Sequence, residues 1–281
     1  MINFIRDKIY NFFGVNEIKE RQNKILINQG KIINSINSNL NKKNINDFEY
    51  RIFSQFGEDG IIQYLINNLK IEKKIFVEFG VENYEEANTR FLLENNNWKG
   101  LIIDSSRENI KFIKQQQYFW KNNISAINEF IKVENINEIL KKNKIIGKIG
   151  LLSIDVDGND YWIWEGITQI EPDIVVIEYN SRFGNDRSVT IPYDPKFVRG
   201  KENSILYFGA SLKALKKLGS SKGYELFCTN LNGNNAFFVK KELINEKLLK
   251  ERNLDSFHDK TFMETKNDKD FNLNDYPLIE V

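Results

Sequence analysis

Short apolar runs alternate with amphipathic stretches along most of this chain. Such runs are typical of buried strands, and the spacing of apolar residues in the stretches between them is that of helices. The pattern predicts strands over 75–79, 101–103, 124–130, 150–154, 174–177, 224–229 and 235–239, and helices over 86–95, 107–118, 136–142, 161–167 and 210–218. Strands separated by helices form a parallel sheet with helices on both faces. We therefore expect an α/β fold.

The last two predicted strands are joined by Asn232, Gly233 and Asn234. An Asn-Gly pair between two apolar runs is a strong signal for a β-hairpin. The mostly parallel, seven-stranded sheet should therefore end in antiparallel strands.

The first 46 residues show helical spacing and no strand pattern. Ile18, Ile25 and Ile32 recur every seven residues, and a second series does the same, namely Leu26, Ile33 and Leu40. Two interpretations stay open, a helical hairpin packed on the main domain and an element of a homodimer. The apolar residues near Phe4 and Tyr10 could pack on the domain or touch a membrane surface. We divide the chain into a helical extension (1–47), an α/β domain (48–242) and a charged tail (243–281).

Composition excludes several classes of protein. The 40 basic and 39 acidic side chains nearly cancel, which argues against a general electrostatic grip on nucleic acid. Cys228 is the only cysteine, so the chain has no internal disulfide and no multi-cysteine zinc site, and its place in a predicted strand favours packing. No apolar run approaches the roughly 18 residues of a membrane span, and the N-terminus lacks the apolar core of a signal peptide. We expect a cytoplasmic protein.

The segment after the first strand is acidic and holds one glycine. Ligands of open parallel sheets bind beyond the carboxyl ends of the strands, and Gly80 would allow a tight turn and a close backbone approach there. The segment has neither the glycines of a dinucleotide fingerprint nor a P-loop. Glu82, Glu85 and Glu86 would repel a pyrophosphate. A ligand with an ammonium and a sulfonium group suits this acidity better.

Asp104 follows the second strand and precedes Ser105 and Ser106. An acidic residue at this place can accept hydrogen bonds from both hydroxyls of a ribose. It could also cap the next helix. We favour ribose binding because the residue stands at a strand end.

A dense group of oxygen-bearing side chains follows the fourth and fifth strands. Asp155 and Asp157 come after the fourth strand, and Glu178 and Asn180 come after the fifth. These side chains could bind Mg²⁺ or another divalent cation, remove a proton from a hydroxyl, or hold an ammonium group. The only histidine, His258, lies in a polar segment away from the predicted strand ends. A general base should therefore be a carboxylate or a metal-bound alkoxide.

Several motifs, taken in order, resemble the FkbM-type class I S-adenosylmethionine-dependent methyltransferases. They cover roughly residues 53–240, and some resemble members from bacterial polysaccharide gene clusters. The motifs are Ser54-Gln-Phe-Gly-Glu-Asp-Gly60, Val77-Glu-Phe-Gly80 with Asn88-Thr89, Gly100-Leu-Ile-Ile-Asp104, Asp155-Val-Asp-Gly-Asn-Asp160, Ile177-Glu-Tyr-Asn180, Tyr207-Phe-Gly-Ala-Ser-Leu-Lys-Ala-Leu215 and Asn234-Asn-Ala-Phe-Phe238.

The resemblance implies a Rossmann-like sheet with a final antiparallel strand and S-adenosylmethionine as the methyl donor. It places Glu78 and Gly80 in the first-strand cofactor motif, Asp104 at the ribose and Asp155 near the methionine moiety. Two further residues, Gln55 and Glu58, belong to a motif that covers the cofactor. The first loop departs from the family pattern, because Glu82 and Tyr84 or its neighbours replace the later glycines.

The function that follows is methyl transfer to an oxygen of a sugar, or of a nucleotide- or phosphate-linked sugar, in polysaccharide biosynthesis. Asp155, Asp157 and Glu178 would carry the catalysis, and Ser105 would help Asp104 to bind the cofactor. Asn180, Arg182 and Tyr193, with the basic residues up to Arg199, would form the acceptor wall, although this segment could also be a solvated loop. A dinucleotide-dependent oxidoreductase and a non-catalytic scaffold are the alternatives.

Overall fold

The computed structural model describes residues 14–40, 44–201, 203–255, 272 and 275–281. The chain divides into two compact units, residues 1–41 and residues 42–281. In the first unit, α2 (Val15–Asn39) is one continuous helix, so the described residues contain no turn of a helical hairpin. The residues proposed for membrane contact near Phe4 lie outside the described residues, as does His258.

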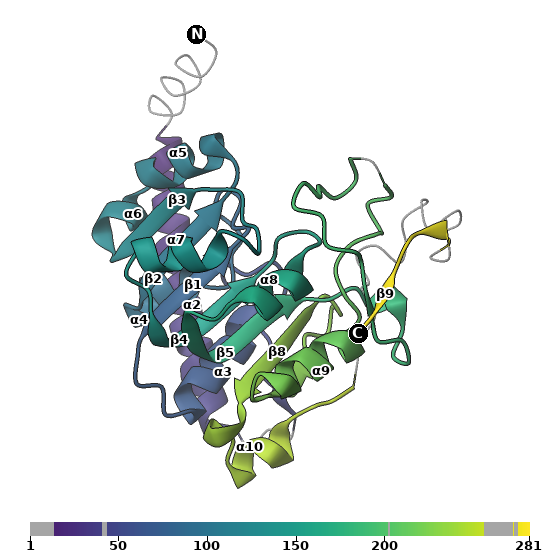
Figure 1. Cartoon of the computed structure of the whole chain (residues 1–281). Coiled ribbons are helices and arrows are strands. Elements are labelled where there is room, and N and C mark those ends of the chain that lie inside the picture. The colour runs from purple at the N-terminus through teal and green to yellow at the C-terminus, as the bar shows by residue number, and fades with distance from the viewer. Residues whose placement is uncertain (1–13, 41–43, 202, 256–271, 273–274) are drawn as a thin grey trace. The chain divides into compact units, whose positions relative to one another are not determined.

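The second unit is built on a seven-stranded sheet in the order β3-β2-β1-β4-β5-β8-β7 (Figure 1). The first five strands in this order pair in parallel, whereas β8 is antiparallel to both of its neighbours. The Rossmann-like sheet with terminal antiparallel strands is thus confirmed. The strands are β1 (Ile75–Phe79), β2 (Lys99–Asp104), β3 (Ile124–Asn128), β4 (Gly147–Ile154), β5 (Ile170–Glu178), β7 (Tyr224–Thr229) and β8 (Asn235–Lys240).

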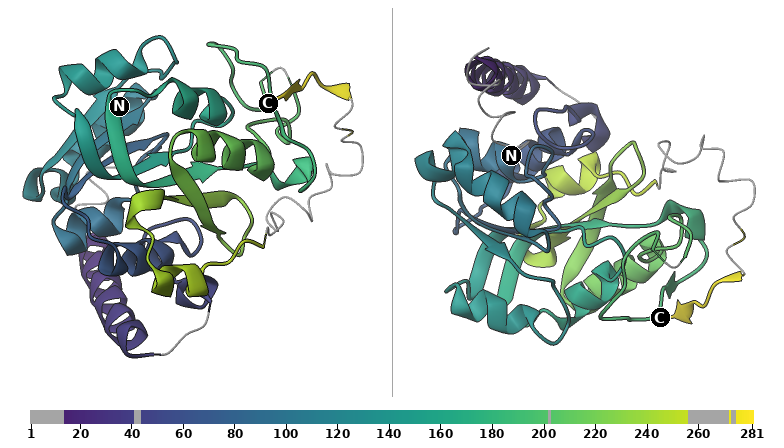
Figure 2. Two further views of the ribbon diagram at one scale, coloured as in Figure 1. Left: turned by 60° about the horizontal axis from the view of Figure 1, so that its bottom comes forward. Right: turned by 90° about the horizontal axis from the view of Figure 1, so that it is seen from above.

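Helices cover both faces of this sheet (Figure 2). One face packs against α7 (Ile136–Lys142), α8 (Asp160–Gly166) and α9 (Leu212–Ser221). The other packs against α3 (Glu58–Asn68), α4 (Arg90–Asn96), α5 (Arg107–Gln115), α6 (Gln117–Lys121) and α10 (Glu246–Glu251). Alternate strand residues serve the two cores, as Leu152 and Leu151 do. Because both faces are covered, the strands are nearly continuous apolar runs.

Some element bounds differ from those predicted. The helix expected from residue 86 begins only at Arg90, and the N–H groups before it donate elsewhere, that of Ala87 to the backbone oxygen of Phe53 and those of Asn88 and Thr89 to Glu78. The helix expected over 107–118 is two helices, since Gln116 is extended. The helix α3 was not predicted. The strands β4 and β5 start earlier than expected because Gly147 pairs with Ile170.

The segment between β5 and α9 forms a small core of its own. Phe183, Val189, Ile191 and Tyr207 are buried together there. In the same region β6 (Val189–Thr190) pairs antiparallel with β9 (Ile279–Glu280). Short 3-10 turns complete the elements, namely η1 (Ile45–Phe48), η2 (Ser181–Phe183) and η3 (Lys241–Leu243). No helix among the described residues has both the length and the apolar character needed to span a bilayer.

Candidate functional site

A cavity of about 450 Å³ lies at the carboxyl ends of β1, β4 and β5. This is the point at which the strand order reverses, where ligands of open α/β sheets bind. Its size is within the range of small-molecule sites. Six carboxylates line it, namely Glu78, Glu82, Glu86, Asp155, Asp157 and Glu178. Arg199 is the only basic side chain among the lining residues of the described chain, so the cavity is strongly acidic.

Gly80 brings the ends of β1 and β4 together. Its φ is +70°, a left-handed conformation that glycine adopts readily. A Cβ at this position would lie 1.5 Å from the backbone oxygen of Asp155. The close backbone approach expected of Gly80 is therefore present, although its partner is the fourth strand of the protein itself.

Glu78 holds the loop that follows β1. Its carboxylate accepts hydrogen bonds from the backbone N–H groups of Asn88 (2.9 Å) and Thr89 (3.2 Å), from the Thr89 hydroxyl, and from Ser153 Oγ (3.3 Å). Burial raises the pKa of Glu78 in spite of these bonds. The N–H groups in front of α4 are thus taken by a carboxylate of the chain.

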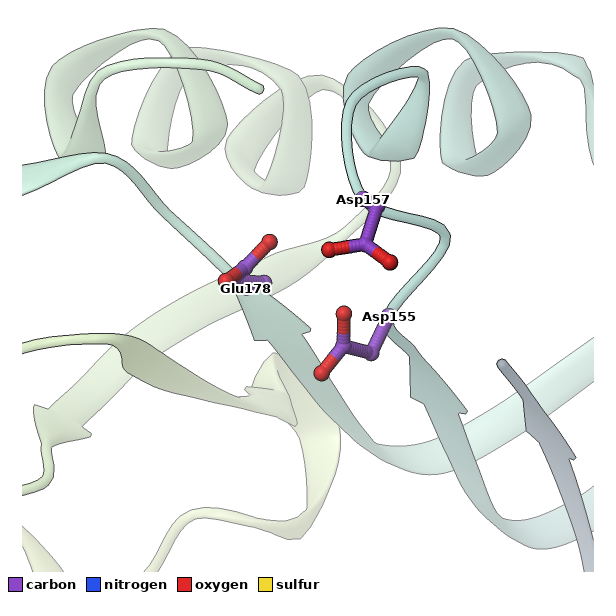
Figure 3. Close-up of side chains that lie close together, drawn as sticks. All are labelled: Asp155, Asp157 and Glu178. Carbon is purple, nitrogen blue, oxygen red and sulfur yellow. The ribbon is translucent and has the colours of Figure 1, made fainter. Parts of the chain in front are cut away.

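Asp155, Asp157 and Glu178, called here the acid cluster, point toward one another (Figure 3). Each contributes a carboxylate oxygen, and these oxygens all lie within 4.8 Å of one another. The parallel register of β4 and β5 explains this, since Ile154 pairs with Ile177 and the next residue of each strand is acidic. The structure thus brings together three of the four side chains expected at these strand ends.

Burial and mutual repulsion act on the acid cluster. Burial, followed by the charge of Asp157, raises the pKa of Asp155 well above its usual range. Burial, followed by the charge of Asp155, does the same to the pKa of Glu178. The Oε2 atom of Glu178 is buried without a hydrogen-bond partner among the described residues. Both carboxyls therefore bind a proton more tightly than an exposed carboxyl does.

Arg199 reaches the acid cluster from the segment between β6 and α9. Its Nη1 lies 3.0 Å from Asp157 Oδ1 and 3.3 Å from Glu178 Oε1. Its Nε donates to the backbone oxygen of Ile205 at 2.9 Å. The guanidinium carbon lies 3.5 Å from the centre of the Phe208 ring. Arg199 is the one member of the predicted acceptor wall that lines the cavity.

The remaining residues expected at the acceptor or a metal do not line the cavity. Asn180 is buried, its amide group donates to the backbone oxygens of Leu206 and Phe208, and its Oδ1 accepts from Arg182 N–H. The hydroxyl of Tyr193 donates to Glu134 at 2.6 Å. Neither Arg182 nor Tyr193 is among the lining residues. The roles expected of these three stay predictions, which the loop contacts of Asn180 and Tyr193 do not favour.

Asp104 joins β2 to the loop after β1. Its Oδ2 accepts from Glu82 N–H at 2.8 Å, and its Oδ1 accepts from Ser106 N–H at 2.7 Å. The cap of α5 is Ser106, not Asp104. Ser105 is exposed, and neither it nor Asp104 is among the residues that line the cavity. Ribose binding by Asp104 stays a prediction, which would use the remaining acceptor capacity of its carboxylate.

The two residues expected to cover the cofactor have different positions. Gln55 lines the cavity, whereas Glu58 is fully buried and does not. The Oε1 atom of Glu58 accepts from the amides of Asn230 (2.7 Å) and Asn235 (2.9 Å), which fixes the turn between β7 and β8. Glu58 therefore positions the turn that carries part of the cavity wall, and its contact with the cofactor stays a prediction.

Sequence reasoning missed part of the lining. Asn88, Asn232, Asn234 and Asn235, to which it gave no ligand-binding role, all face the cavity. The Asn-Gly signal was interpreted only as a turn, although a turn after β7 lies at the same edge as the ends of β1 and β4. Cys228 is buried in β7, which agrees with the packing role expected of it.

No protein-family model matches the chain. The DNA-directed RNA polymerase subunit alpha of Euglena longa is 30% identical over 185 residues, covering 56% of this chain and 83% of that protein. Since 56% of 281 residues is about 157, the alignment contains gaps. Asn, Ile and Lys supply more than a third of this chain, and such a bias produces identities between unrelated proteins. We therefore do not assign the chain to that family.

Several solved methyltransferases resemble this structure. The N-terminal domain of EvdMO1 with SAH bound has a TM-score of 0.44 and 10% identity, covering 66% of this chain and 80% of that chain. An O-methyltransferase from Bacillus cereus in complex with SAH has a TM-score of 0.42 and 10% identity, covering 76% and 88%. An S-adenosylmethionine-dependent methyltransferase from Clostridium acetobutylicum has a TM-score of 0.41 and 11% identity, covering 73% of this chain and 94% of that chain. At such values we infer neither activity nor cofactor from the likeness.

Proposed function

We propose that the protein is an S-adenosylmethionine-dependent methyltransferase that methylates an oxygen of a small polar acceptor, a sugar or a nucleotide- or phosphate-linked sugar. The observation that carries this proposal is the acidic cavity at the switch point, which is lined by six carboxyl groups and one guanidinium, and in which the carboxyls of Glu82, Glu86 and Asp157 are exposed. A cofactor that bears an ammonium and a sulfonium group matches this charge. Bound cations are favoured where opposite charges are partly desolvated.

The same cavity disfavours a dinucleotide-dependent oxidoreductase. A pyrophosphate needs free N–H groups at a helix N-terminus and tolerates little negative charge nearby. Here the N–H groups of Asn88 and Thr89 already donate to Glu78. Glu82 and Glu86 add negative charge beside them. A phosphate group would therefore meet carboxylates in place of donors.

A non-catalytic scaffold accounts poorly for the acid cluster. Burying like charges without full compensation destabilises a protein. Asp155 and Glu178 nevertheless stand side by side, and Glu178 Oε2 has no partner among the described residues. Such an arrangement is typical of functional sites.

The chain's own residues supply the positioning and the base. When bound, the cofactor provides a methyl group on a positively charged sulfur. The cavity holds the acceptor hydroxyl in line with that methyl group, which removes much of the entropic barrier. The carbon–oxygen bond would form as the carbon–sulfur bond breaks and S-adenosylhomocysteine leaves, and a carboxylate of the acid cluster would accept the proton of the hydroxyl. Burial and mutual repulsion raise the pKa of Asp155 and of Glu178, so whichever of the two is ionised binds a proton more tightly than an ordinary carboxylate does.

The rest of the lining supports a hydroxyl-rich acceptor. Five amide side chains face the cavity, namely Gln55, Asn88, Asn232, Asn234 and Asn235. Amides both donate and accept hydrogen bonds, as sugar hydroxyls require. The acidic lining would repel a phosphate, so the nucleotide or phosphate of a linked sugar would lie outside this cavity.

A methyl-transfer assay tests the proposal. The purified chain is incubated with S-adenosylmethionine carrying a radioactive methyl group and a panel of free, nucleotide-linked and phosphorylated sugars. Label that enters a sugar and resists base is expected, because an ether is stable where a methyl ester is not. Transfer to a nitrogen acceptor, or only to carboxylates, would contradict the proposal.

A further inference from the structure

The acid cluster needs positive charge near it. Its oxygens lie within 4.8 Å of one another, and Glu178 is 7% exposed. Asp155 is half-buried and Asp157 is exposed, so the cost falls mainly on Glu178, whose buried charge is offset by a proton, by a metal ion or by a basic side chain. The structure supplies a basic side chain at that place.

We propose that the guanidinium of Arg199 is the resident cation of the acid cluster, and that it fills the position in which a divalent metal ion would bind. The inference concerns the same site as the proposed function. It rests on the geometry of the site, and its test does not require methyl transfer.

The distances make the guanidinium and a metal ion mutually exclusive. A divalent ion bound by Asp157 Oδ1 and Glu178 Oε1 would lie about 2.0–2.6 Å from each oxygen. The Nη1 of Arg199 lies 3.0 Å and 3.3 Å from the same two atoms. The two cations would occupy the same space and would repel each other.

Arg199 is held in place from its other sides. Its Nε donates to the backbone oxygen of Ile205, and its guanidinium stacks on Phe208. Only 15% of its side chain is exposed. Moving it aside to admit a metal ion would break this hydrogen bond and the cation–π contact. These contacts therefore favour the arrangement in which the guanidinium of Arg199 stays in the acid cluster.

The usual ligand set for a metal is also incomplete. Asn180, which the sequence offered as a fourth ligand, uses its amide group on the backbone of the loop. A guanidinium presents several donors in a fixed plane and suits two carboxylates on different strands. The geometry thus fits a metal-independent enzyme.

Manganese binding to the full chain tests this inference. Paramagnetic Mn²⁺ is titrated into the wild type, Arg199→Met, Arg199→Lys and Arg199→Met/Asp157→Asn, with circular dichroism to verify folding. Wild type and Arg199→Lys should show no saturable binding at the acid cluster up to millimolar Mn²⁺. Arg199→Met should gain a site that binds Mn²⁺ at least tenfold more tightly than the wild type does. The added Asp157→Asn change in the double variant should remove this site again. The Lys variant keeps the charge, so it separates charge from a general disturbance of the loop.

Two outcomes would overturn the inference. Tight Mn²⁺ binding by the wild type that Asp157→Asn abolishes would show that the arginine does not exclude the metal. No gained site in a folded Arg199→Met variant would show that the arginine does not stand in for one. A parallel titration with S-adenosylhomocysteine reports separately on the proposed function.

Discussion

Single residues set the dimensions of the cavity. Gly80 is the clearest example, because its missing Cβ lets the first strand end pass the backbone of Asp155. Gly147 has nearly the same φ, +72° against +70°, but has no atom within 4 Å of an added Cβ. A comparison of alanine substitutions at the two glycines therefore distinguishes the cost of the left-handed conformation from the cost of steric contact.

We expect Gly80→Ala to destabilise the fold by about 2–5 kcal/mol, the combined effect of a left-handed alanine and a forced backbone shift. Gly147→Ala should cost only about 1–2 kcal/mol, the conformational part. Urea unfolding of both variants measures the difference. Equal losses would mean that the contact between Gly80 and Asp155 does not constrain the site.

Asp104 tests how the cofactor is held. Asp104→Asn should weaken the binding of S-adenosylhomocysteine by about 1.5–3 kcal/mol if the carboxylate makes charge-assisted bonds to the ribose. Glu108→Gln, the same change at an exposed position of α5, should leave affinity unchanged. Calorimetry on both variants gives the comparison. An unaltered affinity of Asp104→Asn would mean that Asp104 does not bind the ribose and serves only to accept hydrogen bonds from Glu82 and Ser106.

The sequence indicated which residues stand at strand ends, but not which of them reach the cavity. Asp155 and Glu178 were predictable because strand register places them side by side. The position of Asn180 was not predictable, because its hydrogen-bond partners Leu206 and Phe208 are distant in sequence. Arg199 appeared only as one of several basic loop residues, and nothing local distinguishes it from Arg187, which is exposed.

Among the elements, the turn in front of α3 is organised by one buried carboxylate. Asp59 Oδ2 accepts from the N–H groups of Ile52, Phe53 and Ser54 and from the Ser54 hydroxyl. This turn carries Gln55 and Phe56 to the cavity. Burial raises the pKa of Asp59 from 3.8 to about 6.

This shift makes stability depend on pH. The folded state binds the Asp59 proton more tightly than the unfolded chain, so the contribution is complete below about pH 4 and is lost as pH rises through 6. The free energy of unfolding of the wild type, relative to Asp59→Asn, should fall by on the order of 1–3 kcal/mol between pH 4 and 7.5. Urea unfolding across this range measures it. The difference in unfolding free energy between the wild type and Asp186→Asn, a change at an exposed site, should stay constant over this range, and an equal trend in both differences would contradict the assignment.

Element prediction succeeded where burial decides and failed where turns do. The seven strands follow from apolar runs that are covered on both faces. In front of α4, which starts late, the N–H groups of Asn88 and Thr89 donate to Glu78, and no pattern of apolar residues reveals such contacts. The pattern of apolar residues does not predict α3, because polar side chains of this helix, those of Glu58, Asp59 and Gln63, are buried with its apolar ones.

At the scale of the whole molecule, the charge of one cavity contrasts with the balance of the chain. The sequence carries a net charge of +1, yet six acids and one arginine line the cavity. Strand order concentrates them, because the ends of β1, β4 and β5 are neighbours in the sheet. Composition alone could not have indicated this concentration.

The most direct test of the central claim is calorimetric titration of the full chain with S-adenosylhomocysteine and, separately, with NADH. The acidic cavity and the occupied N–H groups before α4 predict saturable binding of S-adenosylhomocysteine and no binding of NADH. Binding of NADH alone would contradict the account and favour an oxidoreductase, and binding of neither compound would favour a scaffold.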